Sequence, residues 1–306
     1  MGRARAVSGE RTDGSGAQRE RPIHPERVES VEYGPEERRL SYAEYGDPSG
    51  EPVVVLHGTP GSRLLGALFD EDARDRCVRV LAPDRPGFGR SADWSGRRPI
   101  DAGAWFEALL ADADVSTAPV AAFSGGSADG LALAATRGDL VDRLDLVSGA
   151  VPPSIARGTP RLQRTLGRVA VRTPRLLGAA LRGQTSIAAR GSPSTVVGQY
   201  TDEPGEIRAS TAELVRRDFV ESCTRSRNGA VTELSWVVEG WGFDVRDVDC
   251  PVTLWHGDRD ANVPVADASR LRDRLSNGQL TRLDADHLTA LSASRSRILD
   301  RVAPRD

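Results

Sequence analysis

The stretch that decides the fold is residues 119–126, which read PVAAFSGG. Its apolar part has the pattern of a buried strand, and residues 128–137 behind it have the pattern of a helix. A serine on so sharp a strand-to-helix turn takes strained backbone angles that present its hydroxyl above the sheet edge. Ala122 and Gly126 are small enough for that turn. The stretch therefore predicts a nucleophilic Ser124 at a helix start, where free N–H groups favour developing negative charge.

Ser127 is the competing nucleophile, because it also follows a glycine in this turn. It falls inside the first turn of the predicted helix, and Asp129, two places after it, is too bulky for the sharp bend. We therefore prefer Ser124. The alternative without chemistry is a glycine-rich turn whose serine only caps the helix.

Further strands and helices alternate on both sides of this turn. The predicted strands cover residues 28–33, 39–45, 52–56, 78–82, 119–123, 144–147, 252–255 and 279–283, the first two as a hairpin around Gly34-Pro35. The predicted helices cover residues 64–76, 102–111, 128–137, 266–275 and 288–302. Alternation at this pitch predicts an α/β fold with a doubly wound, mainly parallel sheet.

One segment interrupts the alternation. Residues 152–240 contain helical windows and no convincing strand, which predicts a helical cap inserted into the core. The core then consists of residues 27–151 and 241–306. Residues 1–26 are rich in Arg, Gly, Ser and Glu and lack the apolar stretch of a secretory signal, so we expect a disordered tail. The helical windows of the cap are residues 161–169, 174–182 and 207–222.

The composition excludes several classes of protein. The chain has 306 residues and a net charge of -3, so no overall basic field favours nucleic acid or anionic lipid as a partner. All 41 basic residues are arginine, which excludes Schiff-base and P-loop lysine chemistry. No apolar run approaches the roughly 20 residues that cross a bilayer. The 3 cysteines are scattered without a C-x-x-C pair, so we expect a reducing cytoplasm.

Among the 4 histidines, one suits the role of general base. His24 lies in the tail, and His57 and His256 each follow or end a buried strand within a glycine-containing loop, as structural histidines do. His287 lies in the loop after the last predicted strand, and loops at the carboxyl ends of parallel strands form the sites of open α/β sheets. We therefore predict that His287 takes the proton of the serine.

A carboxylate must orient that imidazole and stabilise its charged form. Asp258 and Asp260 both follow a predicted strand, in the run HGDRD that begins at His256. We prefer Asp260, because it lies further along the loop, and assign Asp258 to a turn in which it bonds local backbone.

These residues resemble the α/β-hydrolase family over about residues 28–302. The order Ser124, Asp260, His287 is the order of nucleophile, acid and base in that fold. The run HGTPG that begins at His57 is similar to its oxyanion-loop motif, and DRPGFGRS at residues 84–91 is similar to the loop after the next strand. The resemblance implies an oxyanion hole formed by the backbone N–H groups of Thr59 and Gly125.

Two residues depart from the family pattern. Ala122 stands where glycine is usual, which adds one methyl group, and Asp286 precedes His287 where the family often has glycine. Asp286 either favours the charged imidazole or faces water. Relatives that open epoxides or carbon–halogen bonds place aspartate where Ser124 stands, so those reactions are disfavoured.

The resemblance implies a serine hydrolase that cleaves a carboxylic ester of a small molecule through an acyl-enzyme intermediate, without cofactor or metal. Two alternatives stay open. An aminopeptidase or amidase of the proline iminopeptidase type needs acidic residues in the cap to hold a substrate ammonium, and Asp202, Glu203 and Glu206 are candidates. A binding protein whose activity has lapsed would keep the fold without turnover.

The remaining candidates concern the pocket. Trp236, Trp241 and Phe243 lie where the cap returns to the core and suit an apolar pocket, with hinge packing as the alternative. Residues 87–92 spell the G-x-G-x-x-A pattern of a dinucleotide site, but a loop rather than a helix follows them, which disfavours a cofactor. We expect the cap arginines to form solvated faces rather than to grip an anion; they include Arg161, Arg164, Arg168, Arg172 and Arg175.

Overall fold

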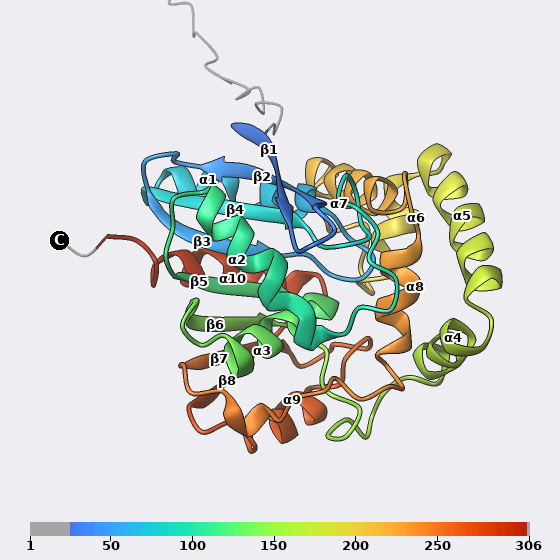
Figure 1. Ribbon diagram of the computed structural model, residues 1–306. Coiled ribbons are helices and arrows are strands. Elements are labelled where there is room, and N and C mark those ends of the chain that lie inside the picture. Colours follow the sequence, from blue (N-terminus) through green and yellow to red (C-terminus); the bar gives the residue numbers. More distant parts are fainter. Residues whose placement is uncertain (1–24, 305–306) are drawn as a thin grey trace, which may run out of the picture.

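The computed structural model describes residues 25–304, so residues 1–24 of the predicted tail lie outside the described part. An eight-stranded sheet with the order β1-β2-β4-β3-β5-β6-β7-β8 crosses the molecule (Figure 1). The strands are β1 (Arg27–Tyr33), β2 (Arg38–Gly46), β3 (Glu51–Leu56), β4 (Val78–Asp84), β5 (Ala118–Phe123), β6 (Val141–Val147), β7 (Val252–Gly257) and β8 (Gly278–Leu283).

Strands β3 to β8 are parallel to one another. Strand β2 pairs antiparallel with β1, its partner in the hairpin, and with β4. The central strands are apolar because both of their faces are covered: Val54 and Val120, which are paired in the β3–β5 ladder, are fully buried. Gly34 turns the hairpin with a φ of 69°, a conformation that glycine adopts without steric cost. The predicted doubly wound, mainly parallel sheet is confirmed.

Helices cover both faces of the sheet and bury two separate layers of core. On one face, α2 (Ala102–Asp112), α3 (Ser127–Thr136) and α9 (Val265–Arg272) enclose a cluster that includes Trp105 and Leu131. On the other face lie η1 (Arg63–Phe69), α1 (Asp70–Arg74) and α10 (Thr289–Leu299), around Phe69 and Ile298. Short 3-10 turns complete the core: η2 (Pro99–Asp101), η3 (Ser124–Gly126) and η4 (Val245–Asp247).

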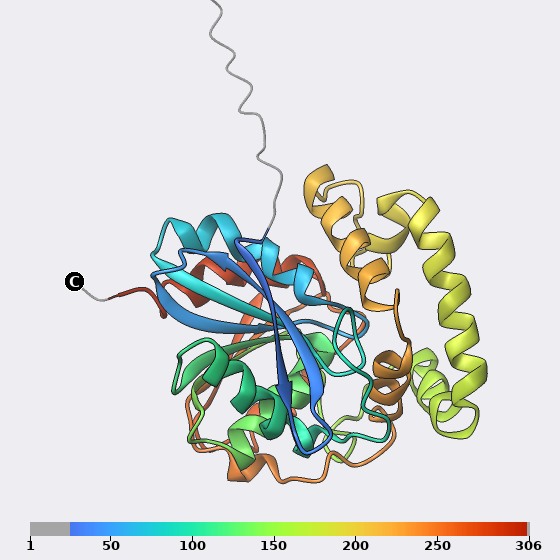
Figure 2. The same ribbon diagram turned by 45° about the horizontal axis from the view of Figure 1, so that its top comes forward.

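We call residues 152–240 the helical insertion, since the described chain forms no strand between β6 and β7. Its helices lie beside the core, at one end of the sheet (Figure 2). Their bounds are α4 (Arg161–Arg172), α5 (Pro174–Arg190), α6 (Pro193–Val197), α7 (Ala209–Ser222) and α8 (Asn228–Ser235). Leu162, Leu176 and Ile187 on α4 and α5 are exposed, whereas Leu177 and Leu181 are buried against the rest of the insertion.

Some elements differ from their predictions. The helix predicted over residues 64–76 is a 3-10 turn, η1, followed by the short α1, because the chain must turn back into β4 and Cys77 does so with a φ of 53°. Helix α5 runs further than predicted, and α6 and α8 were not predicted. In α8, Gly229 is a poor helix former, but it lets the helix approach Gly87 so closely that a methyl group on it would lie 2.7 Å from the Gly87 backbone.

Among residues 25–304, no helix combines the length and the apolar character that spanning a membrane requires.

Candidate active site

Ser124 sits on the sharp turn between β5 and α3 that the sequence predicts. Its φ is 51°, in the left-handed region that residues other than glycine rarely adopt. The preceding residue, Phe123, is still extended, with φ and ψ of -95° and 133°. A backbone held in this conformation is strained and is found where a side chain must be presented at one point. The turn therefore lifts the Ser124 hydroxyl out of the sheet, toward the loops that follow the other strands.

A chain of hydrogen bonds links Ser124, His287 and Asp260. The Ser124 Oγ lies 3.0 Å from His287 Nε2, and His287 Nδ1 lies 3.0 Å and 2.9 Å from the two carboxylate oxygens of Asp260. Because Nδ1–H donates to the carboxylate, Nε2 of the neutral ring is free to accept the serine proton. His287 and Asp260 are buried, at 2% and 7% exposure, so bulk water does not compete for these bonds.

The loop after β7 fixes Asp260. The backbone amides of Asn262 and Val263 each donate to Asp260 Oδ1 over 2.9 Å. Burial raises the pKa of Asp260, but the hydrogen bonds from His287 and the Val263 amide outweigh it and hold that pKa below its ordinary value. Asp258, the alternative acid, instead pairs with Arg282 at 2.6 Å on an exposed part of the loop.

Two aromatic rings contact the His287 imidazole, and the neighbouring carboxylate of Asp286 anchors its loop. The Tyr200 ring of the insertion stacks on the imidazole with centroids 6.4 Å apart, and the Phe123 ring lies 5.1 Å from it. Both alternatives drawn from the sequence for Asp286 are wrong: the residue is buried, and its carboxylate has other partners than the imidazole. Its carboxylate accepts hydrogen bonds from Thr201 Oγ1 and from the Thr289 amide, the latter over 2.9 Å. The acid beside the histidine thus ties its loop to the insertion and to α10.

The loop after β3 lies against Gly125 and brings Thr59 to the nucleophile. A methyl group on Gly125 would lie 3.2 Å from the Thr59 nitrogen, so the two predicted oxyanion residues are in direct contact. His57 anchors this loop, because its Nε2 accepts a hydrogen bond from the Arg85 amide at 3.1 Å and its Nδ1 donates to Gly58 O at 2.7 Å. Burial and the nearby Arg85 charge hold the pKa of His57 well below its ordinary value, which keeps this ring neutral.

A narrow hollow beside Ser124 has a free volume of about 20 Å³. Asp218 of α7 is its one carboxylate and was not singled out from the sequence. The Ser62 amide and hydroxyl donate to Asp218 Oδ1 over 2.9 Å and 2.7 Å, and burial raises the pKa of Asp218 to about 7. The other lining residues are mostly apolar: Gly58, Thr59, Pro60, Leu65, Phe123, Ser124, Tyr200, Val215, Phe219 and Leu288.

The sequence model of the alpha/beta hydrolase family matches residues 53–300. This chain belongs to the alpha/beta hydrolase family. A haloalkane dehalogenase of Mycolicibacterium paratuberculosis is 36% identical over 129 residues, which are 40% of this chain and 42% of that protein. A proline iminopeptidase of Xylella fastidiosa is 37% identical over 75 residues, or 23% of each chain. The matches thus span less than half the length of these curated relatives.

Solved structures extend the likeness of this chain to nearly the whole fold. A thermophilic esterase from Thermogutta terrifontis superposes with a TM-score of 0.66 and 20% identity, over 90% of this chain and 96% of that one. At such an identity the likeness shows the shared fold alone.

The three aromatic residues predicted for the pocket lie elsewhere in the structure. Trp236 is buried under the Arg97 guanidinium, 4.7 Å from its ring centroid, and the Trp241 Nε1–H donates to Trp236 O over 3.1 Å. Phe243 packs against Trp241, and none of the three lines the hollow at Ser124. Their packing role, the alternative drawn from the sequence, is what the structure favours.

The acidic residues of the insertion that the sequence offered for holding a substrate ammonium do not line the hollow at Ser124. Asp202, Glu203 and Glu206 are not among its lining residues. Asp202 instead donates its amide to Asp286 over 3.3 Å. Asp218 of α7 lines the hollow instead. The arginines from Arg161 to Arg175 that the sequence singled out are exposed on α4 and α5.

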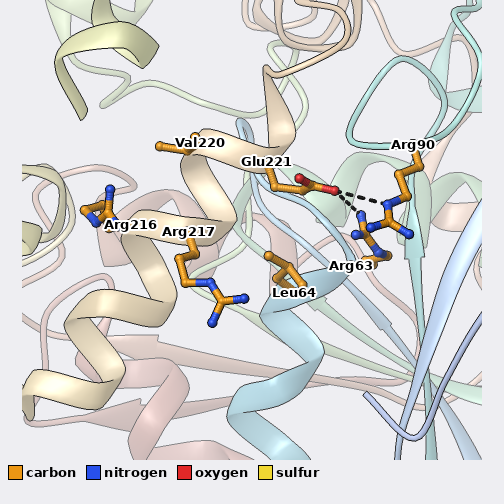
Figure 3. A pocket seen from close by; sticks show the side chains of 7 residues that line it. All are labelled: Arg63, Leu64, Arg90, Arg216, Arg217, Val220 and Glu221. Atoms are coloured by element: carbon orange, nitrogen blue, oxygen red, sulfur yellow. Dashed lines mark ion pairs between the residues drawn. The ribbon is translucent and has the colours of Figure 1, made fainter. Parts of the chain in front are cut away.

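A larger hollow of about 290 Å³ is lined by side chains on another side of α7 (Figure 3). Four arginines line it, but they do not converge on one point. Arg63 and Arg90 both turn to Glu221, at 2.6 Å and 3.6 Å, while Arg216 points away from them. Two of the four arginines thus pair with Glu221 and link α7 to the core.

The glycine pattern of residues 87–92 serves packing. Gly87 has a φ of 87° and its carbonyl accepts the Gly229 amide over 3.2 Å, which seats α8 on the loop. A methyl group on Gly89 would lie 2.3 Å from the Asp84 carboxylate, which receives the Arg90 amide over 2.8 Å. No helix begins in residues 90–98, so the pattern lacks the helix start on which a pyrophosphate would rest.

Proposed function

We propose that this hydrolase cleaves a carboxylic ester of a small molecule through an acyl-enzyme intermediate, with Ser124 as nucleophile, His287 as base and Asp260 as orienting acid. The observation that carries the proposal is the hydrogen-bond chain from Ser124 through His287 to Asp260, at 3.0 Å and 2.9 Å, on a strained strand-to-helix turn. A nucleophile, a base within reach and a group that orients the base together define this type of covalent catalysis.

In the acylation step, Ser124 Oγ attacks the carbonyl carbon while its proton passes to His287 Nε2. The new oxyanion accepts hydrogen bonds from the backbone N–H groups of Thr59 and Gly125, and Asp260 stabilises the imidazolium. The bond between carbon and leaving oxygen then breaks, and that oxygen takes the proton from His287. An alcohol leaves and an ester of Ser124 remains.

Deacylation repeats these steps with water. His287 takes a proton from a water molecule, whose oxygen attacks the acyl carbon of the Ser124 ester. The bond to Ser124 Oγ breaks, Oγ recovers its proton from His287, and the carboxylic acid leaves. No cofactor or oxidant enters the balance.

A serine nucleophile favours acyl transfer over the displacement of a halide, the reaction in the name of the dehalogenase relatives. If a serine oxygen displaced a halide from an alkyl carbon, the product would be an ether of Ser124. An ether has no carbonyl carbon at which an activated water can attack, so the enzyme would be consumed after one event. An acyl ester of Ser124, in contrast, is released by the same His287.

Aminopeptidase activity is the second candidate, because one observation favours it. Asp218 is an acidic residue among those that line the hollow beside the nucleophile, and a peptidase would need such a residue to hold a substrate ammonium. Its pKa of about 7 leaves a large neutral fraction at neutral pH, and a neutral carboxyl attracts an ammonium weakly. Ester cleavage therefore stays the first candidate, and a binding protein without turnover the third.

The test combines covalent labelling with a substrate panel. Wild-type protein and Ser124→Ala are incubated with a fluorophosphonate probe, and both are assayed with p-nitrophenyl esters of rising chain length and with aminoacyl p-nitroanilides. We expect labelling and ester turnover in the wild type only, with short acyl chains preferred because the hollow is narrow. Anilide turnover that exceeds ester turnover would favour the peptidase, and labelling without turnover would favour the binding protein.

A further inference from the structure

Four charged side chains are buried together behind the loop that carries Thr59. Arg85, Arg97, Asp129 and Glu233 have exposures of 0%, 2%, 0% and 5%. They come from separate parts of the chain: the loops after β4 and before η2, helix α3 and helix α8 of the insertion. Two positive and two negative charges balance, as burial of ions requires. The mechanism described above uses none of the four.

Asp129 and Glu233 share the two arginines. Arg85 Nη1 donates to Asp129 Oδ2 over 2.8 Å and to Glu233 Oε1 over 2.5 Å. Arg97 Nη1 donates to Asp129 Oδ1 over 2.8 Å, and Arg97 Nη2 donates to Glu233 Oε1. One carboxylate oxygen of Glu233 is thus occupied by both guanidinium groups, which leaves the other oxygen for a different partner.

That partner is Thr59, the residue proposed to stabilise the oxyanion. Thr59 Oγ1 donates to Glu233 Oε2. Arg85 Nη2 donates to Gly58 O over 3.0 Å and to Thr59 Oγ1 over 3.3 Å. The hydroxyl of Thr59 therefore has one strong acceptor and one donor, and both belong to the buried cluster.

On its other side, Thr59 rests against the turn of the nucleophile. A methyl group on Gly125 would lie 2.1 Å from Thr59 Oγ1 and 2.7 Å from Thr59 Cβ. The side chain of Thr59 is consequently fixed between Glu233 and the Gly125 backbone. The separation of the two oxyanion N–H groups depends on this contact, since one belongs to each residue.

We propose that Glu233 is a positioning residue that holds Thr59, and with it the oxyanion hole, in the geometry of the transition state. The inference rests on the proposed ester hydrolysis. Glu233 touches no reacting atom and acts through the Thr59 hydroxyl. Preorganised donors stabilise a developing oxyanion because they need no reorientation during the reaction. Helix α8 of the insertion thereby takes part in turnover without lining the hollow at Ser124.

A double-mutant cycle tests this role. Glu233→Gln keeps one oxygen for the two arginines but turns an NH₂ group, which cannot accept, toward Thr59. Thr59→Val removes the hydroxyl and keeps both the backbone N–H and the branched shape. We expect each single variant to lower kcat for p-nitrophenyl acetate by about tenfold or more, with KM changed by less than about twofold. The double variant should be no slower than the slower single variant.

Two further variants separate positioning from stability. Glu221→Gln removes the ion pairs of α7 with Arg63 and Arg90 but contacts no residue of the oxyanion loop, so its kcat should equal that of the wild type. Thr59→Ser, which restores the hydroxyl, should recover most of the rate lost in Thr59→Val. Circular dichroism and thermal unfolding show which variants are folded. If Glu233→Gln does not fold, the comparison of Thr59→Val with Thr59→Ser decides alone.

The outcomes are distinct. Multiplicative losses in the double variant, a loss in Glu221→Gln as large as in Glu233→Gln, or Thr59→Val with wild-type kcat would each overturn the positioning role while ester hydrolysis stands. A wild-type protein without ester turnover would overturn the proposed function, and this inference with it.

Discussion

The carboxylate of Asp286 accepts a hydrogen bond from Thr201 Oγ1, so the loop that carries His287 is tied to the helical insertion. The same carboxylate receives the Thr289 amide and hydroxyl over 2.9 Å and 2.6 Å at the start of α10. In addition, the Leu288 amide donates to Tyr200 O over 3.0 Å. The catalytic base of the proposed mechanism is therefore held in place by residues on both sides of its loop, one set of which belongs to the insertion.

Asp286→Asn should destabilise the fold and slow turnover. Hydrogen bonds to a charged group contribute about 1.5–3 kcal/mol each, and the amide cannot accept at both positions. We expect a lower free energy of unfolding in urea and a reduced kcat, because His287 is less well held. Asp284→Asn is the matched control, since the Asp284 side chain is 90% exposed and pairs with Arg259 on the surface. Equal stability of the two variants would contradict this anchoring role of Asp286.

Replacing Ser124, His287 and Asp260 one at a time should lower kcat by different amounts. For Ser124→Ala and His287→Ala we expect kcat to fall on the order of a million-fold, and for Asp260→Asn about ten-thousand-fold, because the orienting acid contributes less than the reacting pair. Steady-state kinetics with a p-nitrophenyl ester measures the three rates. Ser127→Ala serves as the control: its hydroxyl is buried and, among the described residues, without a hydrogen-bond partner, so activity should persist. Loss of turnover in this control would revive Ser127 as the nucleophile.

Gly125→Ala should disturb the oxyanion hole. Its methyl group would lie 2.1 Å from Thr59 Oγ1, so the loop carrying Thr59 must move away. We expect kcat to fall roughly a hundred- to a thousand-fold, the loss found when one oxyanion donor is removed. Gly178→Ala is the matched control, because a methyl group there meets nothing within 4 Å on helix α5. That control should gain about 0.5–1 kcal/mol of stability and keep its rate. A Gly125→Ala enzyme of normal rate would rule out this oxyanion hole.

Asp218 should make stability depend on pH between its ordinary pKa and its raised one. Burial raises the pKa of Asp218 from 3.8 to about 7, so in that window the folded state binds more protons than the unfolded state. Its contribution to the free energy of unfolding is therefore full below pH 3.8, declines as the pH rises through the window, and is lost above about pH 7.

Asp218→Asn removes this titration and keeps an oxygen for the two Ser62 bonds. We expect the variant to gain stability relative to the wild type at pH 8 and less so at pH 5, measured by urea unfolding at both values. Asp84, which also raises this pKa by its charge, is left unchanged in both proteins. Wild type and variant with parallel stability profiles over that range would show that the Asp218 carboxyl does not titrate there.

The order of motifs predicted which residues meet. Parallel strands end at one edge of a sheet, so the loops after β5, β7 and β8 had to gather Ser124, Asp260 and His287. The same rule does not apply to the insertion, because no strand of the sheet lies between its helices and fixes where each one ends. Trp236, Trp241 and Phe243 appeared suited to a pocket because they are aromatic, yet Trp236 and Trp241 belong to the core cluster and Phe243 packs against it.

By itself, the sequence determined the sheet, the strained turn at Ser124 and the three residues linked there, because local hydrophobic patterns and glycine spacing act within a few neighbours. The tertiary structure alone decided that Glu233 would reach Thr59, 174 positions away, and that Asp218 would enter the hollow. Such contacts depend on how an inserted group of helices settles on the core, through buried charge pairing and close glycine contacts that leave no periodic trace in the chain.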